Sequence, residues 1–167
     1  MISADEIVHQ LLSKKSEVWD QVVNLLGLEI LTDKNIDREK VANKVFKNPQ
    51  LLTKLENLLH PYVRKIIHET FNQVKGDPSV RIFVAEVPLL FESGMEQDFD
   101  ITIAVTAEKK KCMERSWLSP KEFKMRSKRL LPDVERKLKA DYVIQNKGSL
   151  AELKADTIKI FNLITGV

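Results

Sequence analysis

The sequence predicts an α/β protein in which a parallel sheet is layered with helices. Three short apolar segments, residues 80–87, 100–106 and 141–144, have the length and composition of strands. The first is almost continuously apolar, as expected of a strand covered on both faces. Helical patterns separate the three, and strands joined through helices pair in parallel by right-handed crossovers. Ligands bind beyond the carboxyl ends of such strands, so Pro88 to Glu92 should lie at the mouth of a site.

Amphipathic helical patterns cover much of the remaining chain. They span residues 5–12, 18–26, 35–46, 49–74 and 150–164. Ser3 and Asp5 are candidate N-caps of the first helix, and the two apolar residues before them make a poor strand on their own. Gly27 is a candidate C-cap of the second. A proline removes a backbone donor, so we expect a kink or a break at His60-Pro61.

Length and composition indicate one domain, residues 1–167. A chain of this size buries roughly 68–70% of its unfolded surface and needs neither metal nor disulfide. Cys112 is the only cysteine, which favours a reducing compartment. The sequence shows no secretory leader and no apolar run near the ~20 residues of a membrane helix. We therefore expect a soluble, cytoplasmic protein.

Positive charge is concentrated in one helical region. The net charge is only +3, but residues 109–139 hold twelve Lys or Arg against four acids. Such an excess indicates an anionic partner, either nucleotide phosphates or nucleic acid. A nucleic-acid interface is the weaker hypothesis, because only Trp117 and Phe123 could stack on bases there.

Several common catalytic motifs are absent from these 167 residues. The three histidines and Cys112 have no metal-site spacing, and no Gly-x-Ser-x-Gly elbow is present. The five glycines form neither a Gly-x-x-x-x-Gly-Lys-Ser/Thr loop nor a dinucleotide fingerprint. Spacing alone therefore does not indicate a nucleotide-binding enzyme.

Five motifs, in order and spread over essentially the whole chain, resemble the dephospho-CoA kinase family. They are Ser3-Ala-Asp5-Glu-Ile-Val-His9, Arg38 before Val45-Phe46-x-Asn48-Pro49, Leu55-Glu56-x-x-Leu59-His60-Pro61, Glu86-Val-Pro-Leu-Leu-Phe-Glu92 and Ala140-Asp-Tyr-Val-Ile-x-Asn146-x-Gly148-Ser149. The resemblance implies a P-loop kinase that transfers the γ-phosphoryl of ATP, with Mg²⁺ as helper ion, to the ribose 3′-hydroxyl of dephospho-CoA.

In that family a strand, a phosphate-binding loop, a helix and most of a second strand precede the segment that is residue 1 here. The resemblance therefore implies a P-loop kinase-like fold missing its first βα unit. A truncated protein, a gene start at an internal codon and a natural short paralogue are all open. Loss of the loop removes its backbone donors, its Lys and its metal-holding hydroxyl, so we expect impaired catalysis.

On the acceptor side, Asp5 matches the family acid that orients or deprotonates the 3′-hydroxyl; the alternative is an N-cap. The resemblance also places Arg38, His60, Pro61, Pro88, Leu89 and Glu92 near the acceptor. A surface arginine and a helix kink are the competing interpretations of Arg38 and His60-Pro61. Glu86 lies in a strand pattern where a charge is costly unless paired, and we assign it no metal.

The basic region, at about residues 108–139, resembles the lid that closes over ATP, with Arg115 and Arg126 at family arginine positions. Lys111 stands where Arg is usual and Arg129 where Gln is usual, and Lys lacks the planar fork of Arg. A solvated charged face is the alternative. Asn146 and Gly148 resemble the loop beside the adenine, or form an ordinary strand-to-helix turn.

Two functional hypotheses follow. The first is an ATP-dependent phosphotransferase, a dephospho-CoA kinase, with dephospho-CoA and ATP as small-molecule substrates. The second is a non-catalytic CoA- or nucleotide-binding or assembly module derived from that family. A sheet edge left open by a missing strand could also pair with a second copy of the chain.

Overall fold

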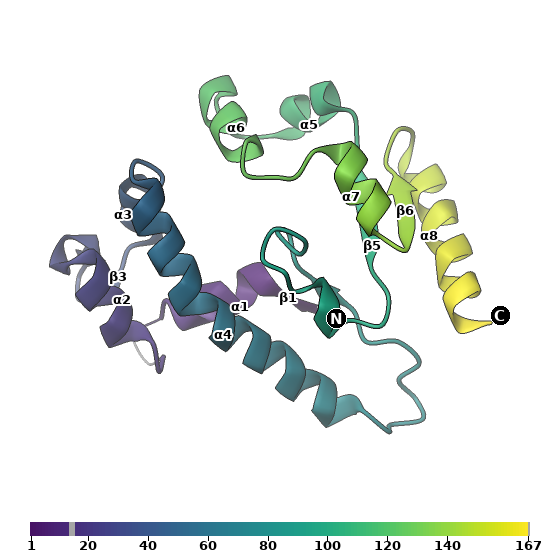
Figure 1. Cartoon of the computed structure of the whole chain (residues 1–167), viewed down its shortest axis with the longest axis horizontal. Helices are drawn as coiled ribbons and strands as arrows, with labels where there is room; N and C mark the ends of the chain where they lie inside the picture. The colour runs from purple at the N-terminus through teal and green to yellow at the C-terminus, as the bar shows by residue number, and fades with distance from the viewer. Residues whose placement is uncertain (14–15, 167) are drawn as a thin grey trace. The chain divides into compact units, whose positions relative to one another are not determined.

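The computed structural model describes residues 1–13 and 16–166, and these form two compact units, Met1–Pro88 and Leu89–Val167 (Figure 1). The elements of the first unit are β1 (Ile2–Ser3), α1 (Ala4–Leu11), α2 (Trp19–Leu26), η1 (Leu28–Ile30), β2 (Leu31–Thr32), β3 (Asn35–Ile36), α3 (Arg38–Val45), α4 (Pro49–Val74) and β4 (Ala85–Glu86). Those of the second are η2 (Glu96–Asp98), β5 (Ile103–Thr106), α5 (Lys109–Arg115), α6 (Pro120–Ser127), α7 (Asp133–Lys139), β6 (Tyr142–Gln145) and α8 (Leu150–Thr165).

The long helix α4 is the scaffold of the first unit, and α1, α2 and α3 all pack against it. Asn48 caps its start by accepting a hydrogen bond from the backbone of Leu51 at 3.1 Å. Its buried side chains recur every four residues: Leu55, Leu59, Val63 and Ile67. They meet a core whose most completely buried side chains are Val18, Val22, Leu26 and Ile30.

The expected break at His60-Pro61 is wrong, because α4 runs through Pro61 as one helix of 26 residues. A proline inside a helix deprives only one carbonyl of its donor, that of the residue four positions earlier. Here that residue is Asn57, and both Asn57 and Pro61 are exposed, so water can reach the freed carbonyl. The expected end near Gly76 is confirmed, since Val74 is the last helical residue.

Strands β1 and β4 pair in parallel, with Ile2 opposite Ala85 and Ser3 opposite Glu86. The short N-terminal segment is therefore a strand despite its length. The central strand expected over residues 80–87 is reduced to Ala85–Glu86, and Val84 is 49% exposed. Glu86 is also exposed, and Val84 and Glu86 lie on the same face of an extended chain, so the expected coverage of both faces is not found.

A hairpin of β2 and β3, paired antiparallel, precedes α3 and was not expected from the sequence. Its two turn residues, Asp33 and Lys34, have φ of 49° and 63°, the left-handed pair that a tight hairpin turn uses. The helix expected from residue 35 begins at Arg38, because Asp37 acts as its N-cap and accepts from the backbone of Glu39 and Lys40.

The second unit is built on β5 and β6, which pair in parallel from Ile103 opposite Tyr142 to Thr106 opposite Gln145. Helix α7 contacts β5 and α8 contacts β6. A capping box starts α8 at Ser149, and Gly166 ends it in a left-handed conformation. Both parallel pairs confirm the α/β class that the sequence predicts.

In the described part of the chain, no helix combines the length and the apolar character that a membrane span requires.

Candidate functional site

Asp5 lies in the first turn of α1, directly after β1, and its side chain is exposed. Ser3 holds the N-cap position, so the interpretation of Asp5 as the cap is wrong. A carboxylate in the first turn is favoured by the positive end of the helix dipole. The structure thus leaves the Asp5 carboxylate available at the carboxyl end of a parallel strand.

Arg38 is the first residue of α3 and is exposed. His60 is half-buried in the middle of α4, and Pro61 beside it is exposed. Since α1 and α3 both pack on α4, the three helices that carry Asp5, Arg38 and His60 belong to one packed unit.

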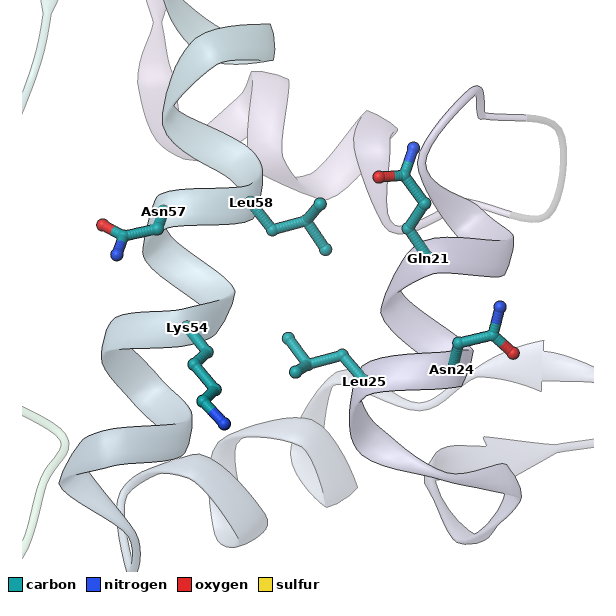
Figure 2. A pocket seen from close by; sticks show the side chains of 6 residues that line it. All are labelled: Gln21, Asn24, Leu25, Lys54, Asn57 and Leu58. Atoms are coloured by element: carbon teal, nitrogen blue, oxygen red, sulfur yellow. The ribbon is translucent and has the colours of Figure 1, made fainter.

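A shallow groove of about 570 Å³ lies between α2 and α4 (Figure 2). Leu25 of α2 and Leu58 of α4 point into it and form an apolar floor (Figure 2). Its other lining residues are polar: Gln21, Asn24, Lys54 and Asn57.

This groove is a feature that sequence reasoning missed, and no site residue predicted above lines it. The apolar pattern marks leucines of α2 and α4 as core positions, whereas Leu25 and Leu58 are only half-buried. Its amides can donate and accept hydrogen bonds, and its lysine carries a positive charge.

Glu86 ends β4 and is exposed, so the expected cost of a buried charge does not arise. Pro88 ends the first unit and Leu89 begins the second. Glu92 is half-buried, and its Oε1 accepts a hydrogen bond of 2.6 Å from the backbone N–H of Leu131. The fold itself therefore occupies one oxygen of the carboxylate that the sequence assigned to the acceptor.

The basic region is helical, as predicted, and its two predicted arginines differ in setting. Arg115 is the last residue of α5 and is exposed. Arg126 of α6 is half-buried, with its guanidinium 5.6 Å from the ring centre of Trp117, in the range of a cation–π contact. That contact lies between α6 and the connection after α5, and Trp117 is itself 86% exposed.

Asn146 and Gly148 follow β6, at the carboxyl end of the β5–β6 pair. The N–H of Asn146 donates to the carbonyl of Thr106 at 2.7 Å, which extends the strand pairing by one residue. The ammonium group of Lys111 in α5 donates to the carbonyl of Lys147. The structure thus brings the start of the basic region to the loop that carries Asn146 and Gly148.

Glycine at position 148 has a local reason. A Cβ there would lie 1.9 Å from Oε2 of Glu152, so the glycine leaves room for the carboxylate that caps α8. The pKa of Glu152 is held below its usual value by hydrogen bonds from the backbone and hydroxyl of Ser149, with a smaller effect of Lys111. The turn interpretation of this loop therefore has direct support.

Among residues 1–13 and 16–166 no three His, Cys, Asp or Glu side chains gather in a way that could hold a metal ion.

The arrangement is that of an α/β protein with parallel strands and a cationic helical segment that begins after the carboxyl end of β5, the class that includes nucleotide-dependent phosphotransferases. The family model described as dephospho-CoA kinase matches residues 1–152. The chain therefore belongs to the dephospho-CoA kinase family, whose fold is that of the P-loop kinases.

Relatives and solved structures agree. The chain is 39% identical to a dephospho-CoA kinase of Protochlamydia amoebophila over 96% of its own length and 81% of the relative's. It is 37% identical to a dephospho-CoA kinase of Chlamydia caviae, over 99% of its own length and 84% of that relative's length. A dephospho-CoA kinase structure from Campylobacter jejuni superposes with a TM-score of 0.68 at 31% identity, covering 99% of this chain and 84% of that one. A crystal structure from Thermus thermophilus superposes with a TM-score of 0.73 at 27% identity, and the match covers 98% of this chain and 84% of that chain.

Proposed function

We propose that this chain transfers the γ-phosphoryl group of ATP to the ribose 3′-hydroxyl of dephospho-CoA. The observation that carries the proposal is the family match over residues 1–152, which spans the first unit and most of the second. We also propose that the two units act together as a single kinase domain, with the basic region as its lid.

Asp5 is the proposed residue at the attacking hydroxyl. Its carboxylate is exposed and is not used as a cap, so it can orient the 3′-hydroxyl or accept its proton. Further contacts to the acceptor are proposed for Arg38, His60, Pro61, Pro88, Leu89 and Glu92. A cation such as Arg38 suits the phosphates of a nucleotide acceptor.

Arg115 and Arg126 are the proposed cations for the transferring phosphoryl group. Phosphoryl transfer depends on positioning and on neutralising charge that develops on the phosphate oxygens, and a guanidinium offers a planar fork for both. The contact of Lys111 with the loop of Asn146 and Gly148 supports a shared location for the basic region and the adenine loop. Mg²⁺ would help to neutralise the phosphates, and the described residues supply no cluster of three or more His, Cys, Asp or Glu for it.

The second candidate is a CoA- or nucleotide-binding module without turnover. It is favoured by one fact, that these 167 residues hold no Gly-x-x-x-x-Gly-Lys-Ser/Thr loop, the usual cradle for the donor phosphates. Cytoplasmic location, self-association and the weaker nucleic-acid hypothesis stay predictions.

One assay separates the two candidates: formation of CoA from ATP and dephospho-CoA, measured on this chain and on the same chain extended by its upstream coding sequence. Turnover that exceeds the uncatalysed rate and is lost in Asp5→Asn supports the kinase. Saturable calorimetric binding of dephospho-CoA without turnover in either form supports the binding module. Absence of both turnover and binding in both forms contradicts the two candidates together.

A further inference from the structure

The contact between Glu92 and Leu131 joins two segments 39 residues apart, and both lie in the second unit. Glu92 is in the turn that follows Pro88, and Leu131 is the last residue before Pro132, which caps α7. A backbone N–H bound to a carboxylate forms a charge-assisted hydrogen bond, and 2.6 Å is short for one. Leu131 lies within the basic region, where the chain passes from α6 to α7.

The turn that carries Glu92 is firmly built. The N–H of Met95 donates to Leu90 at 3.1 Å, and the N–H and hydroxyl of Ser93 both donate to the carbonyl of Leu89, at 3.0 and 2.8 Å. Met95 closes the turn as a buried side chain, 2% exposed. The Glu92 carboxylate is therefore presented from a fixed backbone.

Helix α7, which follows Leu131, is fastened to the same turn. The ammonium of Lys139 lies 3.7 Å from Oε1 of Glu96 and 5.9 Å from the ring centre of Phe91. Leu131 thus marks the boundary, within the basic region, between α7 and the part formed by α5 and α6, and Glu92 holds that boundary.

The chain between Arg126 and Leu131 is short and hydrogen-bonded. After α6 the chain turns through bonds from the N–H of Arg129 to the carbonyl of Arg126 and from the N–H of Leu130 to that of Ser127. Leu131 comes next. The position of the Leu131 backbone therefore sets where α6, and with it Arg126, can lie.

We propose that Glu92 is a positioning residue: its carboxylate holds the backbone N–H of Leu131 and so fixes the point of the basic lid where the α5–α6 part joins α7. This rests on the proposed function only in taking the basic region as the lid over ATP. It differs from the expectation that Glu92 acts as a contact to the acceptor, since its role here is exerted through Leu131 and α6.

The direct test is amide hydrogen exchange at Leu131 in the full chain. Glu92→Ala removes the acceptor and should speed exchange at Leu131 about ten- to a hundredfold, the effect of losing a hydrogen bond to a charged group. Glu92→Gln keeps an acceptor oxygen and should restore exchange to within about fivefold of wild type. Gln97→Ala, an exposed change nearby, is the matched control and should leave Leu131 unchanged. Equal exchange in Glu92→Ala and wild type would overturn the proposal.

Trypsin cleavage within residues 121–129, with and without ATP, tests the link to the lid. ATP should slow cleavage in wild type and Glu92→Gln and fail to do so in Glu92→Ala. Equal protection in all three variants would overturn the positioning role. No protection in any variant, with exchange at Leu131 still dependent on Glu92, would establish the hydrogen bond between Glu92 and Leu131 but reject the basic region as a lid. That outcome counts against the lid, which the proposal takes from the proposed function, and not against the contact between Glu92 and Leu131.

Discussion

The carboxylate of Asp141 accepts hydrogen bonds from both the backbone N–H and the hydroxyl of Thr102, at 2.7 and 2.8 Å. The two residues directly precede β6 and β5, so they extend the parallel pairing beyond its first register pair. The N–H of Asp141 donates in return to the Thr102 hydroxyl at 3.2 Å. A polar clasp therefore sets where the two strands begin.

The clasp predicts a pH dependence of stability. The Thr102 backbone N–H, and then its hydroxyl, hold the pKa of Asp141 below its usual value. Because its pKa is lowered in the folded state, the ionised Asp141 carboxylate stabilises the fold. This stabilisation is complete above the pKa of the unfolded state, near 4, and is lost as the pH falls through the pKa of the folded state. Asp141→Asn should therefore be less stable than wild type at pH 7, with the gap narrowing below about pH 4.

Urea unfolding of both proteins at a series of pH values checks this. Other acids also lose hydrogen bonds on protonation, among them Asp37 and Glu152, so the difference between the two proteins is the informative quantity. A gap that stays constant from pH 7 to pH 2 would count against the clasp.

Neighbouring leucines of α4 give a second prediction. Leu59 is 5% exposed and faces the core, whereas Leu58 is half-buried and lines the groove with Leu25. Leu59→Ala should lower the free energy of unfolding by about 2–5 kcal/mol, since it opens a cavity. Leu58→Ala should lower the free energy of unfolding by roughly 1 kcal/mol, because the Leu58 side chain is only partly removed from water on folding. Chemical denaturation measures both, and equal losses would contradict the assigned faces.

Helices with a sustained apolar period were predictable from sequence. The pattern of residues 49–74 matches α4, whose four-residue spacing of buried side chains needs no partner to be recognised. Strand extent was not predictable in this way. Residues 80–84 are as apolar as a strand, but strand structure requires a neighbour, and the pairing with β1 reaches only Ala85 and Glu86.

The candidate site also has a part that the sequence could predict and a part that it could not. Motif order proposes candidates such as Asp5 and Arg126, but it cannot say which of their atoms the fold already uses. Glu92 illustrates this, because its bond to Leu131 joins residues far apart in sequence and leaves no local pattern. The contact of Lys111 with the Lys147 carbonyl is similar, since any lysine near a loop could make it.

Arg126 supplies a third prediction, for whichever form of the chain turns over dephospho-CoA. Arg126→Lys keeps the charge but loses the planar fork and the stacking on Trp117, so kcat should fall roughly 10²–10³-fold. Lys128→Ala removes an exposed charge just after α6 and should change kcat by less than about threefold. Steady-state kinetics with ATP and dephospho-CoA measure both. Equal losses would indicate a general effect of positive charge rather than the geometry of one guanidinium.

Asp5 supplies the last prediction. Asp5→Asn should lower kcat roughly 10²–10⁴-fold, because the amide cannot accept the proton of the 3′-hydroxyl. The KM for ATP should stay unchanged, since the change concerns the acceptor. The unfolding transition should hardly move, because Asp5 is exposed and Ser3, not Asp5, holds the cap position. Glu6→Gln, the adjacent exposed acid of the same helical turn, is the matched control and should retain activity. If both variants lose activity alike, the negative charge of the turn matters and Asp5 has no particular role as acceptor of the proton.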